Sequence, residues 1–434
     1  MERQFREILS NKVSGTTTGL WLLIPEHLKL GTWDLLGKMS HSQDDTQLKR
    51  KLGLQVIHES AMCNTRIRKS NTICHQGFDI LNGLPFIASD VQIHNLLSEH
   101  SLEQSRELQI ALGKLRQIKG DYRGNLIAMD PHRIVSYTER ISPKKKIKRN
   151  ERAKKMLQTF FAIDSQTGQP IGFDIGFSSN TVSNGTKNLV KQIKEIIPAC
   201  NNPLILSDAE HYTEELLNLF ALDNSLDILV PAPRNQRIVK YFNKLEYKEY
   251  WPGYYIGTSS FRFGDDRSIP EQLLIVQRQG LKQTEFEYKA FISTRKENVV
   301  EMLTTEFPTR WTIEEYFKYE GSLGWNKALT QNLNIRYGKM SLCLITQYLI
   351  NQLRKILPED YRKYEVKHLS DEMFHKFNGD LRVKDDKIIV TLYGIPEKFG
   401  LRTHYENLPQ KLESENINPR VPWLYNYKVD FHFK

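Results

Sequence analysis

Three acidic side chains occur at positions that suit metal-dependent phosphoryl transfer. Asp130 and Asp208 each close an apolar run that reads as a strand, and Glu314 lies at the start of an amphipathic segment. Carboxylate oxygens are the ligands that Mg²⁺ and Mn²⁺ prefer in proteins. Two such ions, held about 3.5–4 Å apart, can activate an attacking oxygen and stabilise the leaving oxygen of a phosphodiester. We therefore expect Asp130, Asp208 and Glu314 to bind two Mg²⁺ or Mn²⁺ ions and to cut or join a nucleic-acid backbone.

Each of the two aspartates also has a structural interpretation. The carboxyl ends of strands in an open α/β sheet border the crevice where ligands bind, and both aspartates fit that position. An aspartate after a strand more commonly caps a helix or forms a turn. Asp208 could cap a helix that begins near Glu210. Considered one strand at a time, the pattern leaves both interpretations open.

Glu314 lies between two cations at helical spacing. Arg310, Glu314 and Lys318 share one helix face, which predicts either an exposed salt-bridge ladder or a metal-binding carboxylate between two cations that contact DNA phosphates. Thr312 and Glu315 match a capping box. That match gives Glu315 a structural role and leaves Glu314 available for metal binding.

A basic run lies between the first strands of the same region. Charge runs are usually solvated loops, but one beside a phosphoryl-transfer site favours contact with a DNA backbone. The formal net charge of the chain, +10, also favours a polyanionic partner. The basic side chains that we expect to bind DNA here are Lys144, Lys145, Lys146, Lys148 and Arg149.

The elements that must position these residues indicate an α/β fold. Residues 1–118 show apolar side chains at three- and four-residue spacing, which predicts helices. From residue 119 extended runs appear, with a Gly/Pro turn at 165–170, and the element order β-β-β-α-β-α-β predicts a mixed sheet flanked by helices. Residues 236–300 are rich in Tyr, Phe, Trp and Gly and read as β-rich, and helices resume near 309.

Composition limits the setting of the protein. The four cysteines form no closely spaced metal-binding pairs, which indicates reduced thiols and a reducing cytoplasm. The charged N-terminus lacks the apolar region of a secretion signal. No stretch approaches the ~20 apolar residues that span a bilayer, so we expect no membrane partner.

Two further observations connect this pattern to a known family. The segment 310–318 resembles the third-carboxylate segment of insertion-sequence DDE transposases, whose signature is Tyr-x2-Arg-x3-Glu-x6-Lys. The spacing from arginine to glutamate matches, whereas Phe307 stands at the tyrosine position and Gly321 at the lysine position. Lys318 or Lys327 could supply the missing cation.

The two aspartate segments resemble the same family. Residues 204–212 are similar to its second-aspartate strand and helix, and residues 127–130 to its first. The order of the three segments, with a β-rich block before the glutamate, also matches.

The resemblance implies a ribonuclease H-like core interrupted by a β-rich insertion, with Asp130, Asp208 and Glu314 as a catalytic triad. It further implies cleavage at transposon ends, attack of the freed 3′-hydroxyl on target DNA, and a homodimer on paired ends. The partners would be double-stranded DNA with terminal inverted repeats and target DNA. The protein would then be cytoplasmic and nucleoid-associated. Trp251 or Tyr254 could hold a flipped base, although a core role suits either ring.

The segments that we expect combine the patterns and the resemblance. They are a helical, DNA-binding N-terminal domain at 1–118, the first part of the core at 119–235, the insertion at 236–300, the second part of the core at 301–360, and a C-terminal segment at 361–434 without assigned chemistry.

Two other functions remain compatible with the sequence. One is a DNA-binding protein whose nuclease core is inert, because the tyrosine and lysine of the signature are replaced. The other is a nuclease of the same fold that cuts without joining. Retention of all three acidic residues favours an active enzyme, since a binding protein does not need them.

Overall fold

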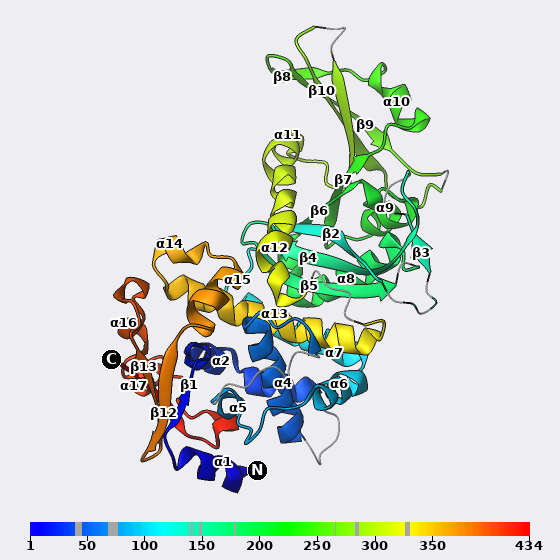
Figure 1. Ribbon diagram of the computed structural model, residues 1–434. Coiled ribbons are helices and arrows are strands. Elements are labelled where there is room, and N and C mark those ends of the chain that lie inside the picture. Colours follow the sequence, from blue (N-terminus) through cyan, green and yellow to red (C-terminus); the bar gives the residue numbers. More distant parts are fainter. Residues whose placement is uncertain are drawn as a thin grey trace. The chain divides into compact units, whose positions relative to one another are not determined.

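The computed structural model describes residues 1–39, 46–67, 77–137, 139, 141, 143–146, 150–177, 179–264, 266–282, 286–325 and 330–434. Lys148, Arg149 and Lys327 lie outside these described residues. The chain forms two compact units, which are coloured along the sequence in Figure 1. The terminal unit comprises Met1–Leu112 and Phe317–Lys434, and the central unit comprises Gly113–Tyr316.

A mixed sheet forms the centre of the central unit. In the described ranges it has ten strands in the order β3-β4-β2-β6-β7-β11-β10-β9-β8, and β5 pairs with β4. β2 is antiparallel to β4 and parallel to β6, and β6 is parallel to β7. The core strands are β2 (Leu126–Val135), β4 (Lys154–Asp164), β5 (Gln169–Phe177), β6 (Leu204–Ser207) and β7 (Asp227–Ala232).

The order of these core strands is that of a ribonuclease H-like fold. Counted along the chain, the sheet runs third, second, first, fourth and fifth, with the parallel pairs at the first, fourth and fifth strands. The mixed α/β fold predicted from the sequence is therefore confirmed.

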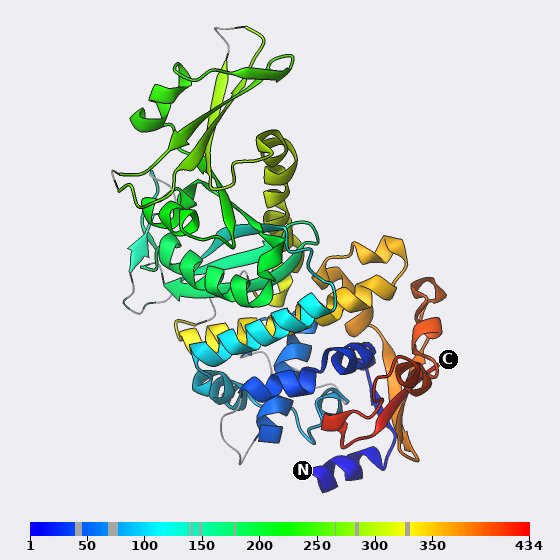
Figure 2. The ribbon, with the colours of Figure 1, turned by 180° about the vertical axis from the view of Figure 1, so that it is seen from behind.

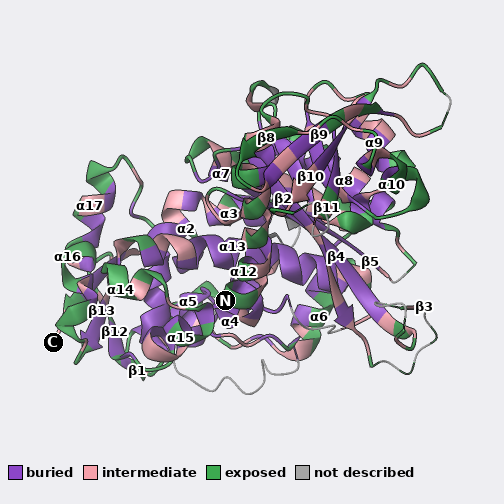
Figure 3. Cartoon of the chain, turned by 90° about the horizontal axis from the view of Figure 1, so that it is seen from above, coloured by how far each residue is buried: buried purple, intermediate pink, exposed green. Residues whose placement is uncertain are grey.

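The β-rich insertion extends this sheet instead of forming a sheet of its own. Its last strand pairs antiparallel with β7, for example Ile292 with Val230, because the insertion leaves the core at one end of β7 and returns beside it. Its first strand, β8, is exposed along its length (Figure 3). The elements are α10 (Gln236–Phe242), β8 (Lys248–Trp251), β9 (Tyr254–Phe261), β10 (Gln272–Gln279) and β11 (Glu287–Ser293).

Apolar residues cover both faces of the central sheet. Ile127 and Met129 of β2 point to the face covered by α8 (Val182–Ile196) and α9 (Glu214–Ala221), which Figure 2 shows in front of the sheet. Leu126 points to the other face, where it shares a core with Met302. This alternation follows from the two-residue period of a strand, and it fixes which side chains can reach either helical layer.

The helical segment after the insertion changes its hydrogen-bonding pattern three times. It runs through α11 (Val299–Glu301), the π-turn η8 (Met302–Glu306), the 3₁₀ turn η9 (Phe307–Trp311) and α12 (Thr312–Glu320). Pro308 lies at the change from η8 to η9. Proline has no backbone N–H and its ring clashes with the carbonyl four residues earlier, so a regular α-helix cannot continue through it.

The terminal unit is built around the buried helix α13 (Leu333–Ile356). Helices α4 (Thr46–Ala61), α6 (Asp90–Glu99) and α2 (Ile24–Leu30) pack against it. Its described sheet has the order β1-β12-β13-β14, and the hairpin predicted at 380–392 is confirmed by the pairing of β12 with β13. The strands are β1 (Val13–Gly15), β12 (Asn378–Lys384), β13 (Lys387–Tyr393) and β14 (Lys428–Phe433).

The other helices of four or more residues complete the chain. Among the described helices, none is both long and apolar enough to cross a membrane. The remaining α-helices are α1 (Glu2–Leu9), α3 (Thr32–Leu35), α5 (Phe78–Leu81), α7 (Leu102–Ile118), α14 (Glu359–Arg362), α15 (Val366–Leu369), α16 (Leu401–Tyr405) and α17 (Leu408–Ser414).

Candidate active site

Asp130 and Asp208 are brought side by side by the parallel pairing of β2 with β6. Met129 is paired with Ser207, and each aspartate is the residue that follows in the chain, Asp130 still within β2 and Asp208 just past the end of β6. The expectation that Asp130 closes its strand was wrong, because β4 continues to pair with β2 as far as Val135. The strand on the other side, β6, does end at this level. Asp130 therefore lies within β2, at the point where β2 has lost its β6 neighbour but is still paired with β4.

Asp208 combines its strand-end position with a turn. Its Oδ1 accepts hydrogen bonds from the backbone N–H of Glu210 (3.1 Å) and from Nδ1 of His211 (2.8 Å), and it caps the short 3₁₀ helix Ala209–His211. The capping interpretation of Asp208 is thus present in the structure. Burial acts to raise the pKa of Asp208, but the His211 contact and the Glu210 N–H outweigh it, so the pKa is lowered. Both contacts use the same carboxylate oxygen, which directs the side chain.

Glu314 is the acidic residue of the helical segment. Arg310 Nη2 lies 3.1 Å from Glu314 Oε1, so the predicted pairing of these residues at helical spacing is present. The capping box predicted from Thr312 and Glu315 is wrong. Thr312 already has helical backbone angles (φ −54°, ψ −29°) because η9 precedes it, and its hydroxyl donates to the carbonyl of Ser165 (3.2 Å).

The charges of the other two carboxylates act on Asp130. The pKa of Asp130 is raised to about 7, first by burial, then by the negative charge of Asp208, and further by Glu314 and Glu210. Arg310 acts in the opposite direction. Burial with like charges disfavours the ionised form of a carboxyl group, and a bound cation would relieve that repulsion. The donor set, three carboxylates in one electrostatic cluster, suits Mg²⁺ or Mn²⁺.

The side chains are not gathered around one point in this conformation. In the part of the chain that the structure describes, no three Asp, Glu, His or Cys side chains converge closely enough to bind one ion together. Glu314 is engaged by Arg310, and Asp208 by His211. Coordination by all three would therefore require Glu314 to exchange its arginine partner for the ion.

Comparison with known proteins identifies the family. The model of a transposase DDE domain matches residues 122–349, which is more than half of the chain and includes all three acidic residues. The chain belongs to the DDE transposase family. Among solved structures it is similar to a piggyBac transposase synaptic complex with hairpin DNA, with a TM-score of 0.37 and 12% sequence identity over 95% of this chain and 89% of that chain. No curated protein matches the sequence.

Two residues of this DDE transposase that the sequence analysis did not select support the acidic cluster. Arg133, three residues after Asp130 on β2, donates to both carboxylate oxygens of Glu210, and its Nε donates to Gln158 (3.2 Å). His211 is buried and contacts Asp208. The spacing of three residues after each aspartate was the available signal, but only the tertiary fold shows where these side chains point.

The basic residues of this transposase lie at one edge of its sheet. Lys144 and Lys145 form β3, which pairs with Lys154 and Lys155 of β4. Lys144 and Lys145 also line a cavity of about 680 Å³ with Glu210. Of the other predicted DNA-binding residues, Lys146 is exposed. Lys148 and Arg149 fall outside the described residues.

Lys318 lies past the last residue of the central unit. It is exposed, and its ammonium lies 5.4 Å from the centre of the Tyr319 ring.

The two aromatic residues of the insertion stack on each other. The rings of Trp251 and Tyr254 are 4.1 Å apart and nearly parallel. Tyr254 is buried in the same core as Met302, which agrees with a core role, whereas Trp251 is 44% exposed. The Trp251 ring therefore stacks on a buried tyrosine ring and is itself partly exposed to solvent.

Proposed function

We propose that the protein is an active transposase that cleaves DNA at the ends of an insertion sequence and joins the freed 3′-hydroxyl to target DNA. The observation that carries the proposal is the register of β2 and β6, which sets Asp130 beside Asp208. The charge effect of Glu314 on Asp130 supports Glu314 as the third member of the proposed triad. Membership of the DDE transposase family supports the same reaction.

In this proposal the three carboxylates hold two Mg²⁺ or Mn²⁺ ions. When bound, the ions would supply an activated attacking oxygen and stabilise the leaving oxygen. Asp130 and Asp208 offer oxygens from the sheet, and Glu314 offers its own from the helical segment. Arg310 would then be released to contact a DNA phosphate, a role suited to its planar guanidinium.

DNA contact would involve the basic edge beside this site. Lysine and arginine neutralise phosphates without reading sequence, so these residues would hold either an end of the element or target DNA. We assign this role to Lys318 and to Lys144, Lys145, Lys146, Lys148 and Arg149. The substrates would be duplexes with terminal inverted repeats, bound by a homodimer on paired ends. Trp251 would be available to stack on an unpaired base.

A comparison of wild type with Asp208→Asn tests the proposal. The substrates are duplexes that carry the inverted repeats flanking the gene, incubated with Mg²⁺ and target DNA. Wild type should release 3′-hydroxyl ends and join them, and Asp208→Asn should do neither while it still binds DNA. Asp266→Asn, a change of an exposed aspartate in the central unit, is the matched control and should act like wild type.

Each alternative function has its own outcome in this experiment. Equal nicking by wild type and Asp208→Asn would refute the triad. Nicking by wild type without joining would identify a nuclease of the same fold. Binding without any nicking would identify an inert DNA-binding protein.

Two observations support that inert alternative as a second candidate. Phe307, at the tyrosine position of the signature, packs edge-on against Phe291 with 5.1 Å between ring centres. Gly321, at the lysine position, is buried in a 3₁₀ turn. Neither residue can supply the hydroxyl or the ammonium that the signature contains. A wild-type protein that binds its ends but leaves them uncut would support this candidate.

A further inference from the structure

Helix α8 presents a face of lysine and asparagine side chains that no part of the proposed site uses. Lys187, Lys191 and Lys194 follow one another at spacings of four and three residues, and Asn184 and Asn188 lie on the same side. The opposite side of the helix is buried in the core of the central unit. Residues 182–194 contain no aspartate or glutamate. Within 182–194 the exposed side chains of the helix are therefore basic or amide-bearing, and the acidic Glu195 in its last turn pairs with Lys114 of α7.

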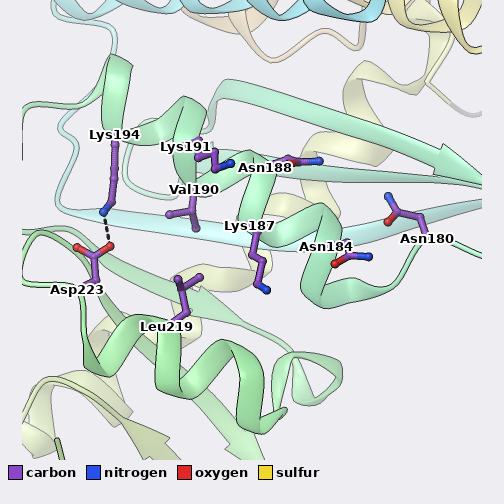
Figure 4. Close-up of a pocket in the computed structure, with 9 residues that line it drawn as sticks. All are labelled: Asn180, Asn184, Lys187, Asn188, Val190, Lys191, Lys194, Leu219 and Asp223. Carbon is purple, nitrogen blue, oxygen red and sulfur yellow. Dashed lines mark ion pairs between the residues drawn. The ribbon is translucent and has the colours of Figure 1, made fainter. Parts of the chain in front are cut away.

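This face borders a cavity between α8 and α9. The cavity has a volume of about 680 Å³, and its apolar base is formed by Val190 and Leu219. Figure 4 shows Lys187 and Lys194 extending from α8 towards α9, with the dashed ion pair from Lys194 to Asp223. A polar rim over a small apolar base would accept an extended ligand that carries anionic groups along one side.

The ion pairs on this face are weak restraints on its lysines. Lys187 pairs with Glu215, and the side chains are 37% and 52% exposed. Lys194 pairs with Asp223, whose side chain is more buried, and Lys191 between them is exposed. Exposed ion pairs contribute little because water and salt screen them. An incoming phosphate could therefore replace the carboxylate partner of Lys187 at small cost.

The α8 face is continuous with the edge of the proposed active site. A second cavity, at the N-terminal end of α8, is lined by Lys144, Lys145 and Glu210. Asn180 lines both cavities, so they adjoin. Glu210 follows Asp208 by two residues and donates its N–H to it. Polar surface therefore runs from the acidic cluster, past β3, and along α8.

We propose that the α8 face binds the sugar–phosphate backbone of the DNA duplex as it leaves the acidic cluster. The inference rests on the proposed function for the identity of the ligand. Lysine ammonium and asparagine amide groups are among the donors that commonly contact phosphate oxygens. The three lysines are spread over about 10 Å of helix at 1.5 Å per residue, so they match successive groups of an extended polyanion and exceed the size of a single phosphate.

The test uses the full-length protein with Lys187→Gln, Lys191→Gln and Lys194→Gln combined. The control combines Lys363→Gln, Lys367→Gln and Lys376→Gln. This control also removes three positive charges from exposed lysines, two of which have acidic partners. Binding is measured by fluorescence anisotropy over a range of KCl concentrations. The duplexes either end at the cleavage site or extend by about two helical turns on the flanking side or on the element side.

The expected result is a length-dependent loss. For one of the extended duplexes, the slope of log affinity against log salt should decrease by about 2–3, at about 0.9 per lost phosphate contact. Affinity for it should fall about tenfold or more at moderate salt. The duplex that ends at the cleavage site and the control variant should show no such change. Equal slopes for variant and wild type on every duplex would overturn the inference.

Two measurements keep the outcomes separable. If the triple variant unfolds, Lys191→Gln alone should still lower the salt slope by about 1, because this exposed residue lies at the centre of the face. Asp208→Asn is assayed for nicking on the same extended duplexes. An inactive Asp208→Asn protein together with unchanged lysine variants would defeat the α8 inference alone. A fully active Asp208→Asn protein would defeat the proposed function.

Discussion

Arg310 and Glu314 form an ion pair one helical turn apart, with 3.1 Å between Nη2 and Oε1. The same guanidinium acts to lower the pKa of both Asp130 and Asp208. Arg310 therefore acts on all three carboxylates. A divalent ion bound by those carboxylates would compete with Arg310 for the same negative charge.

Replacing Arg310 with glutamine should tighten metal binding while it weakens catalysis. Loss of a nearby cation removes repulsion towards the ion, and we expect the apparent affinity for Mn²⁺ to increase about tenfold, the size of a one-unit change in carboxylate pKa. The metal-free variant should melt at a lower temperature, and Mn²⁺ should raise its melting temperature more than that of wild type. DNA nicking should decrease because a phosphate contact is lost. Calorimetric titration with Mn²⁺ measures the affinity directly.

Arg310→Lys is the control, because it keeps the charge but not the planar donor geometry. It should leave Mn²⁺ affinity near that of wild type and still reduce nicking. Unchanged Mn²⁺ affinity in Arg310→Gln would show that the arginine does not oppose the ion.

A second prediction concerns the buried histidine behind Asp208. His211→Phe removes the hydrogen bond from Nδ1 to Oδ1 and leaves only the backbone N–H of Glu210 to orient the carboxylate. Loss of a group that orients a metal ligand typically reduces activity by about 10–100-fold. We expect that reduction in nicking at saturating DNA, with DNA affinity unchanged. The Mg²⁺ concentration that gives half of the maximal rate should increase. His211→Asn should recover part of the lost activity. An unchanged Mg²⁺ dependence would indicate that His211 only fills space.

The sequence predicted the parts of this site that depend on local pattern. The strand before Asp208 was recognisable because four apolar or small residues precede it and a turn follows. The pairing of Arg310 with Glu314 follows from helical spacing. These features need only a few neighbouring residues, so a single sequence contains enough information to predict them.

The features that escaped prediction depend on distant neighbours. Asp130 lies inside its strand because β4 continues to pair with β2 beyond it. Thr312 fails as a cap because Pro308 changes the preceding turns and because the carbonyl of Ser165 accepts its hydroxyl. In the terminal unit, Ser14 pairs with Asp380. No pattern within either segment reveals a partner so far along the chain.

A third prediction tests the packing that holds α8 against the sheet. A Cβ atom added at Gly185 would lie 2.2 Å from Cδ2 of Phe160, a buried residue of β4. Alanine normally stabilises a helix by about 1 kcal/mol relative to glycine. Here the overlap should reverse that sign, and we expect Gly185→Ala to lower the free energy of unfolding by about 1–3 kcal/mol. Chemical denaturation measures the difference.

The companion change Phe160→Leu supplies the control for this clash. The double variant should be less destabilised than the sum of the two single changes, because the smaller side chain leaves room for the new methyl group. Additive effects would show that the contact between Gly185 and Phe160 does not limit the approach of α8.

A fourth prediction concerns the pH dependence of stability in the terminal unit. His58 Nδ1 lies 2.6 Å from Asn82 Oδ1, and Asn82 Nδ2 donates to the carbonyl of Phe78, so Nδ1 of His58 must be the donor. Its other nitrogen lies 3.1 Å from Nε2 of His27 and must accept. Both rings are buried and neutral in this arrangement. Burial lowers the pKa of His58 to about 4, although the Asn82 contact opposes it, and burial also lowers that of His27.

Because the pKa of His58 is lower in the folded protein than in the unfolded chain, the unfolded chain binds more protons below about pH 6.5. The two neutral histidines therefore make their full contribution to the free energy of unfolding above that pH. This free energy decreases as the pH falls from about 6.5 towards 4, by up to about 1.4 kcal/mol per pH unit for each histidine. His58→Gln should be less stable at neutral pH but lose less stability on acidification. The exposed residue His94 provides the control, since His94→Gln should follow wild type. Urea unfolding between pH 4.5 and 7.5 measures both curves, and parallel curves for wild type and His58→Gln would contradict the assignment of two neutral rings.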